Sequence, residues 1–241
     1  MIALFNEILV RPFFNLLIFI YNIVPGADFG VAVVVVTVLI RLVLMPLSIK
    51  TLRSQKNIAK LQPKLKELQV KYKGDKQALA REQMALYKEQ GVNPLSGCLP
   101  LLIQLPILLA LYQTFINGFK PESLGLLYNF VENPGAIKTI AFGFFDITQK
   151  SPIMAVTAGV LQFIQAKKAN LAASMGGGGQ GDLASSMNKQ MLYFFPVLIT
   201  IISWNLPFGL TLYWVVTTLY SIFEQMWINK QMSKNEPLKV K

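Results

Sequence analysis

The stretch VVVVTVLIRLVLMP, residues 33–46, constrains the fold more than any other part of the chain. It lies within an apolar run from Phe29 to Ile49, which is long enough to cross the hydrocarbon core of a bilayer as a helix. One charged side chain, Arg41, interrupts the run. Hydrophobic residues make up 53% of the chain and charged residues 15%, a composition typical of an integral membrane protein.

Arg41 lies deep within this predicted span. Lys50, the next charge along the chain, is nine residues away, so a rise of about 1.5 Å per residue puts Arg41 about 13 Å from that end. An arginine near the bilayer centre costs about 2.5–3.5 kcal/mol on insertion scales, so we expect it to face water or a partner. Glu224, about 9 Å in from Lys230 by the same rise, is the candidate charge partner.

Two interpretations of Arg41 follow. In the first, an ion pair with Glu224 locks two helices together, although such a pair stabilises a fold poorly compared with apolar packing. In the second, Arg41 lies in a water-filled cavity that opens to the cytoplasm. Thr37, one helical turn earlier, would then share the polar wall, and Gln104, inside another apolar run, would either line the cavity or bond a neighbouring helix.

Four further apolar segments are predicted spans, two of them short, which indicates an all-α integral membrane protein with five transmembrane helices. The last two spans are separated by NLPFG, whose proline and glycine favour a tight turn. The predicted segments are an extracytoplasmic interfacial helix (1–28), the first span (29–49), a cytoplasmic helical hairpin (50–93), the second span (94–117), an extracytoplasmic loop (118–151), the third span (152–166), a cytoplasmic glycine-rich loop (167–190), the fourth span (191–206), the fifth span (207–228) and a cytoplasmic basic tail (229–241).

The N-terminal segment carries a narrow polar stripe. At 100° per residue, Glu7, Arg11, Asn15 and Asn22 fall on one side of a helix, which is typical of an amphipathic helix in the membrane surface. A signal peptide is the alternative, but Glu7 and Pro12 interrupt its apolar region and no positive segment precedes it.

Charge distribution predicts the orientation. Most of the net charge of +11 comes from lysines and arginines in residues 50–93, around the glycine-rich loop and in the C-terminal tail. The positive-inside rule places these segments in the cytoplasm and the N-terminus outside, so nucleic-acid binding is not needed to explain the charge. The lysine-rich hairpin is interpreted either as a solvated surface or as a docking surface for nascent chains, ribosomal RNA or anionic lipids.

Catalytic and cofactor chemistry find little support in the sequence. The chain has no histidine and one cysteine, Cys98, to which we assign a packing role, and these features remove the commonest general base and any internal disulfide. No phosphate-binding GxxxxGK[ST] loop is present, since GGGGQGD lacks the lysine. We therefore predict a protein that is not an enzyme and that uses no metal or cofactor.

Four stretches together resemble the YidC/Oxa1/Alb3 family of membrane protein insertases: TVLIRLVLMPLS, LQPKLKEL, MALYKEQGVNPLSGCLPLLIQLPILLALY and LPFGLTLYWVVTTLYSIFEQ. The resemblance runs from about residue 29 to residue 231 and is closest to bacterial members of the short type, without a large extracytoplasmic domain. It implies five helices around a hydrophilic groove open to the cytoplasm and to lipid but closed to the outside. The family's functional arginine corresponds to Arg41, and its groove and substrate-contact positions correspond to Thr37, Gln104, Tyr213 and Trp214. Glu224 is a departure, because bacterial members usually carry an uncharged residue there.

The resemblance implies a protein of the bacterial plasma membrane that inserts membrane proteins and helps them fold, alone or with the Sec translocon. The expected partners are nascent membrane proteins, the Sec translocon, the ribosome, the signal-recognition machinery and anionic lipids, with no recognition of a nucleic-acid sequence. Our hypothesis is that Arg41 draws the polar tail of a substrate into the groove while the apolar segment slides along the third and fifth spans into lipid. The rivals are a small-molecule or anion transporter or channel and a chaperone that acts only beside the Sec channel.

Overall fold

The computed structural model describes residues 2–93, 99–174 and 183–235. Cys98, the glycine-rich stretch at 175–182 and the basic residues beyond 235 lie outside the described residues. The elements are α1 (Ile2–Phe5), a π-helical turn η1 (Asn6–Val10), α2 (Arg11–Ile23), α3 (Phe29–Lys60), α4 (Gln62–Lys71), α5 (Lys76–Glu89), α6 (Leu99–Asn117), a 3-10 turn η3 (Pro121–Leu126), β1 (Ile140–Ala141), β2 (Phe145–Asp146), α7 (Pro152–Ser174), α8 (Leu183–Trp204) and α9 (Phe208–Asn235).

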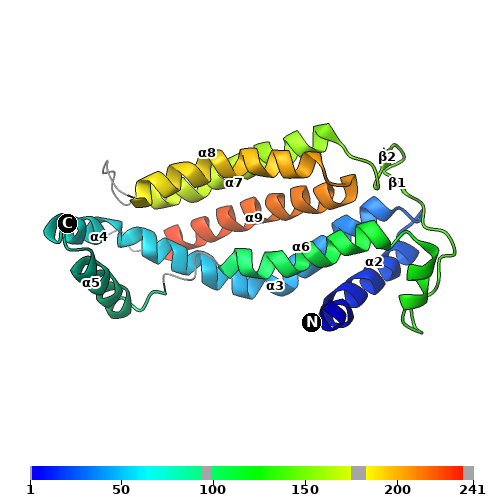
Figure 1. Ribbon diagram of the computed structural model, residues 1–241, viewed down its shortest axis with the longest axis horizontal. Helices are drawn as coiled ribbons and strands as arrows, with labels where there is room; N and C mark the ends of the chain where they lie inside the picture. The colour runs from blue at the N-terminus through cyan, green and yellow to red at the C-terminus, as the bar shows by residue number, and fades with distance from the viewer. Residues whose placement is uncertain (1, 94–98, 175–182, 236–241) are drawn as a thin grey trace.

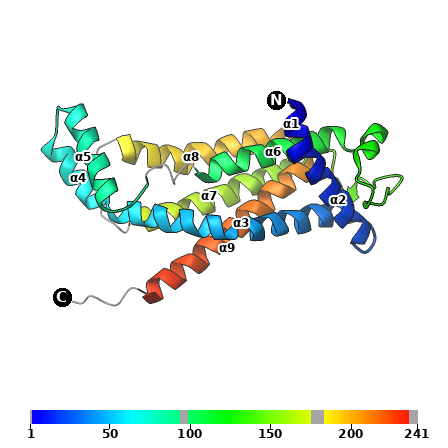
Figure 2. The ribbon, with the colours of Figure 1, turned by 90° about the horizontal axis from the view of Figure 1, so that it is seen from below.

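The long helices lie side by side and form an elongated bundle (Figure 1). Helix α9 contacts α3 on one side and α7 on the other, α8 packs against α7, and α6 runs alongside α3 and α9. Helices α4 and α5 project from one end of this bundle, which we call the hairpin end (residues 50–93) (Figure 2). The opposite end, the loop end, carries residues 118–151 and the first turns of α3, α7 and α9.

Helix α3 begins at Phe29 because the side chain of Asp28 caps it. Asp28 Oδ1 accepts a hydrogen bond from the backbone N–H of Val31 at 3.0 Å, which satisfies one of the free donors of the first turn. The helix continues through Pro46 to Lys60, beyond the apolar run. Pro46 therefore removes one intrahelical hydrogen bond but does not end the helix. Within the described ranges, only α3 is both long and apolar enough to qualify as a membrane span, with a mean hydropathy of 2.5; residues 102–117 and 192–204 are shorter apolar helices.

The hairpin of α4 and α5 has a small core of its own. Gly74, with φ of +104°, makes the turn between the two helices, and Asp75 caps α5 by accepting hydrogen bonds from Gln77 and Ala78. Apolar side chains from both helices and from the end of α3 then meet. They are Leu61, Leu65 and Val92, surrounded by Ile58, Leu86 and Tyr87.

Aromatic side chains fill the main core at the loop end. The ring of Phe29, at the start of α3, lies 6.0 Å from that of Phe115 and 5.1 Å from that of Phe119, both measured between centroids. Phe208, at the start of α9, stacks on Phe145 of β2 at 4.6 Å. Stacked and tilted aromatic pairs at these distances add about 0.5–1.5 kcal/mol each beyond their burial. Aromatic packing therefore joins α3 to α6 and β2 to α9 at the loop end.

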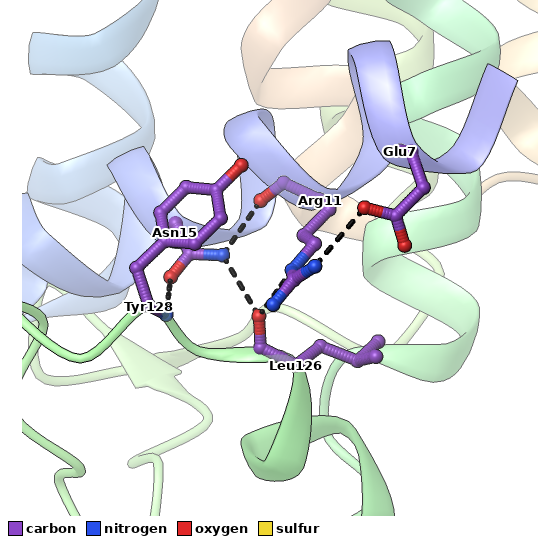
Figure 3. A network of polar contacts seen from close by, with 5 residues as sticks. All are labelled: Glu7, Arg11, Asn15, Leu126 and Tyr128. Atoms are coloured by element: carbon purple, nitrogen blue, oxygen red, sulfur yellow. Dashed lines mark hydrogen bonds and ion pairs between the residues drawn. The ribbon is translucent and has the colours of Figure 1, made fainter. Parts of the chain in front are cut away.

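The N-terminal polar stripe contacts protein (Figure 3). Asn15 donates from Nδ2 to the carbonyl oxygens of Arg11 and Leu126, and its Oδ1 accepts from the N–H of Tyr128 at 2.6 Å. Arg11 donates from Nε to the same Leu126 oxygen, forms a 3.0 Å ion pair with Glu7, and lies over the ring of Tyr128. The stripe thus holds residues 118–151 against α2.

Replacing Asn15 with alanine should loosen this loop. The Tyr128 N–H would lose its partner in a buried position, and a buried donor left unsatisfied costs about 1–3 kcal/mol. A chain of this size should then melt several degrees lower in detergent micelles. The matched control is Glu132→Ala, which removes an exposed side chain from the same loop. Equal melting temperatures for the two variants would contradict the conclusion that Asn15 holds this loop against α2.

Candidate functional site

Three helices contribute to one polar chain inside the bundle. Arg41 is partly buried in the middle of α3, and its Nη2 lies 3.5 Å from Oε1 of Gln104 on α6. The Nε2 of Gln104 in turn donates to the hydroxyl of Tyr213 on α9. Gln104, which contacts Arg41, and Tyr213, which contacts Gln104, are both neutral side chains, so this chain orients the guanidinium without cancelling its charge. Three residues expected from the sequence to share a site therefore lie together.

Thr37 and Trp214 do not join this chain through hydrogen bonds. Thr37 is fully buried, and its hydroxyl donates to the carbonyl oxygen of Val33 within α3 at 2.6 Å. Trp214 follows Tyr213 in the sequence but points about 100° away around the helix, and its Nε1 lies 3.4 Å from Oε1 of Gln162 on α7. The two neighbours on α9 consequently contact different helices.

Glu224 is buried at the hairpin side of Arg41. Its side chain is only 4% exposed, and its Oε2 accepts a 2.6 Å hydrogen bond from the hydroxyl of Ser48 on α3. Its Oε1 has no hydrogen-bond partner among the described residues. Among the residues that the structure describes, no carboxylate oxygen lies within 4 Å of the Arg41 guanidinium. Glu224 is nevertheless near enough to attract that guanidinium electrostatically. A direct ion pair between the two is therefore not formed.

Ser48 was not predicted from the sequence. It lies seven residues after Arg41, so the two share one side of α3, and that spacing is the signal that could have found it. A serine in an apolar helix usually bonds its own backbone, which is why the residue type alone indicates nothing more. The described ranges contain no cluster of three or more residues that could ligate a metal.

The bond between Ser48 and Glu224 predicts a coupling between α3 and α9. Ser48→Ala should destabilise the folded protein by about 1–3 kcal/mol, because it leaves a buried carboxyl oxygen without its donor. Adding Glu224→Gln to Ser48→Ala should recover part of the loss, since an amide is less costly to bury than a charge. Thermal unfolding of both single variants and the double variant in detergent gives the coupling. Purely additive losses would contradict it.

The fold and this site define a helical membrane protein that holds a cationic side chain among neutral polar groups between its helices. Residues 19–235 match the family described as 60Kd inner membrane protein, which is the family of the YidC insertases. The chain therefore belongs to this family, and the resemblance identified from its motifs is confirmed.

Named relatives agree with this assignment. The chain is 35% identical to the membrane protein insertase YidC of Fusobacterium nucleatum over 204 residues, covering 85% of this chain and 87% of the relative. It is 34% identical to the membrane protein insertase MisCA of Bacillus subtilis over 238 residues, covering 96% and 82%. It is 39% identical to the membrane protein insertase YidC 1 of Listeria monocytogenes over 210 residues, covering 85% of this chain and 65% of that relative.

Proposed function

We propose that this protein is a membrane protein insertase of the bacterial plasma membrane, and that Arg41 receives the polar tail of the substrate. Membership of the family and the names of the relatives, which are membrane protein insertases, support the insertase activity. The observation that supports the role of Arg41 is its contact with a neutral side chain, Gln104, which in turn bonds the neutral Tyr213, so that a positive charge is left within the apolar part of the bundle.

In this proposal, α3, α6, α7, α8 and α9 span the bilayer. The shortest, α6, has 19 residues and so extends about 28 Å, close to the thickness of the hydrocarbon core. Each of the five helices also exposes large apolar side chains that lipid would cover. Examples, in the order of the helices, are Val43, Leu105, Val160, Ile201 and Phe223.

The hairpin end faces the cytoplasm in this proposal. Exposed lysines on α4, α5 and the turn between them, such as Lys64, Lys73 and Lys88, support this orientation because basic residues are retained on the cytoplasmic side. The same lysines would provide a surface for a ribosome, the signal-recognition machinery, the Sec translocon or anionic lipids. The loop end, with its aromatic core, would close the bundle toward the outside.

The mechanism follows from the energetics of transfer. A polar or charged group that enters hydrocarbon loses hydration worth several kcal/mol, and a hydrated groove that contains Arg41 would lower this barrier over part of the path. An acidic group of the substrate's tail would move toward the guanidinium, while the apolar segment leaves along α7 and α9 into lipid. Hydrophobic partitioning and the membrane potential, about 2.3 kcal/mol per charge per 100 mV, would complete transfer without a nucleotide.

Reconstitution of the purified protein into liposomes tests this function. An insertase should move a single-span substrate with a short acidic tail into protease-protected form without any other protein, and empty liposomes give the background. A transporter or channel, the alternative suggested by a buried cation, would instead pass a small anion, measured by flux from the same vesicles. A chaperone dependent on the Sec channel would do neither, so flux or the absence of both activities would contradict the proposal.

A further inference from the structure

The short hairpin of β1 and β2 is fixed at the level where the long helices begin. The N–H of Phe142 donates to Oδ2 of Asp28, the residue that caps α3. Ala141 packs so closely on Gly30, in the first turn of α3, that a Cβ at this glycine would lie 2.6 Å from its methyl group. Residues 140–146 therefore lie level with the first turn of α3.

Large apolar side chains of this hairpin point away from the protein. Phe144 is 73% exposed and Ile140 is 49% exposed, although the backbone that carries them is held on both sides. Phe142 adopts a φ of +54°, which a bulky residue rarely takes. The ring of Phe142 packs against Gly30 of α3, which accounts for its conformation, whereas packing within the chain does not account for the exposure of Phe144 and Ile140.

Basic and aromatic side chains border this hairpin. Lys138 and Lys150 are exposed on either side of it, with only long contacts from Nζ, 3.5 Å to Gly26 O and 3.4 Å to Asn205 Oδ1. Trp204, the residue before Asn205, is also exposed at the end of α8. Aromatic rings at the boundary of an apolar helix, with lysines that can reach phosphate groups, are the combination that anchors proteins at a membrane interface.

We propose that residues 140–146 form a lipid anchor on the outer face, in which Ile140 and Phe144 insert into the outer leaflet. Lys138 and Lys150 would then contact the phosphates of the lipid headgroups. A phospholipid surface is the occupant that fits, because exposed apolar side chains lie beside two exposed lysines at the end where α3 begins, and Ile153, in the first turn of α7, is exposed as well. The proposal rests on the proposed function only for the placement of α3 and α7 across the bilayer.

Site-directed spin labelling tests the anchor in liposomes of phosphatidylethanolamine and phosphatidylglycerol that contain only the purified protein. In a Cys98→Ser background, one nitroxide is attached at Phe144→Cys, and two references are attached at Val43→Cys and Glu132→Cys. Oxygen concentrates in lipid and a water-soluble nickel chelate in water, so their relative effects on relaxation report depth. The label at 144 should show an oxygen preference several-fold above that at 132 and approaching that at 43. Equal values at 144 and 132 would overturn the proposal and would instead favour a protein partner, absent from these vesicles, as the occupant of the patch.

Two additions keep the result interpretable. If Phe144→Cys does not fold, Ile140→Cys carries the label, because its side chain belongs to the same patch. Insertion of the acidic-tailed substrate is measured on the same vesicles. A lipid-like signal at 144 without insertion would support the anchor and contradict the proposed function, whereas insertion with a water-like signal at 144 would do the reverse.

Discussion

Replacing Arg41 with alanine is expected to reduce insertion of a single-span substrate with an acidic tail by tenfold or more. The variant removes the guanidinium and leaves the neutral pair of Gln104 and Tyr213 at the site. At the effective dielectric constant of about 20 that holds near a protein surface, two charges about 4 Å apart attract by about 4 kcal/mol, which exceeds the roughly 1.4 kcal/mol that corresponds to a factor of ten. The measurement is the initial rate at which the substrate's tail becomes protease-protected in reconstituted liposomes.

The controls for Arg41 separate charge from structure. Arg41→Lys should retain most of the activity, because an ammonium group at the same depth still attracts a carboxylate. A substrate whose acidic residues are replaced by asparagine and glutamine should depend much less on Arg41 than the acidic substrate does. If Arg41→Ala inserted both substrates at the normal rate, the role assigned to this residue would be wrong.

The second large effect is expected from Gly209→Val, at the first turn of α9. A Cβ at this position would overlap the ring of Phe115 on α6, which packs directly against the glycine. The N–H of Gly209 also donates to the carbonyl oxygen of Ile147 at 3.0 Å, so the backbone is not free to move away. Overpacking of this kind costs about 1–3 kcal/mol, which should lower the melting temperature in detergent by several degrees.

Gly125→Val is the matched control for this prediction. Nothing lies within 4 Å of a Cβ at Gly125, which belongs to the same end of the bundle. Its melting temperature should stay close to that of the wild type. If Gly209→Val had the same melting temperature as Gly125→Val, α6 and α9 could separate at this contact without a cost in stability, and the prediction would be wrong.

The family and the largely helical character of the chain could both be predicted from the sequence, because motif order and apolar runs are local properties. Arg41 stood out for the same reason, since one charge in an apolar run needs no knowledge of the fold to be noticed. The chain of contacts from Arg41 to Gln104 and on to Tyr213 is harder to predict from the periodicity of the sequence. Helical periodicity shows which residues share a side of one helix, but it does not show which helix lies opposite.

Contacts distant in the sequence explain what the sequence could not predict. Asn15 lies in a polar stripe that suits a membrane surface, yet its partners lie in a loop more than 100 residues away. The hydroxyl of Ser48 bonds a carboxyl 176 positions along the chain. The hairpin of β1 and β2 has only two residues per strand, too few for a pattern of alternation to emerge.

The uneven distribution of aromatic packing along the bundle has a mechanical consequence. At the loop end, the ring of Phe115 on α6 meets the ring of Phe29 on α3 and packs against Gly209 on α9, and local opening is rarest where buried apolar contact is densest. Toward the hairpin end, a hydrogen bond between Ser48 and Glu224 joins α3 to α9. Under the proposed function, we expect α3 and α9 to separate at the hairpin end before the loop end opens, so that a polar substrate could enter between them while the aromatic core stays folded.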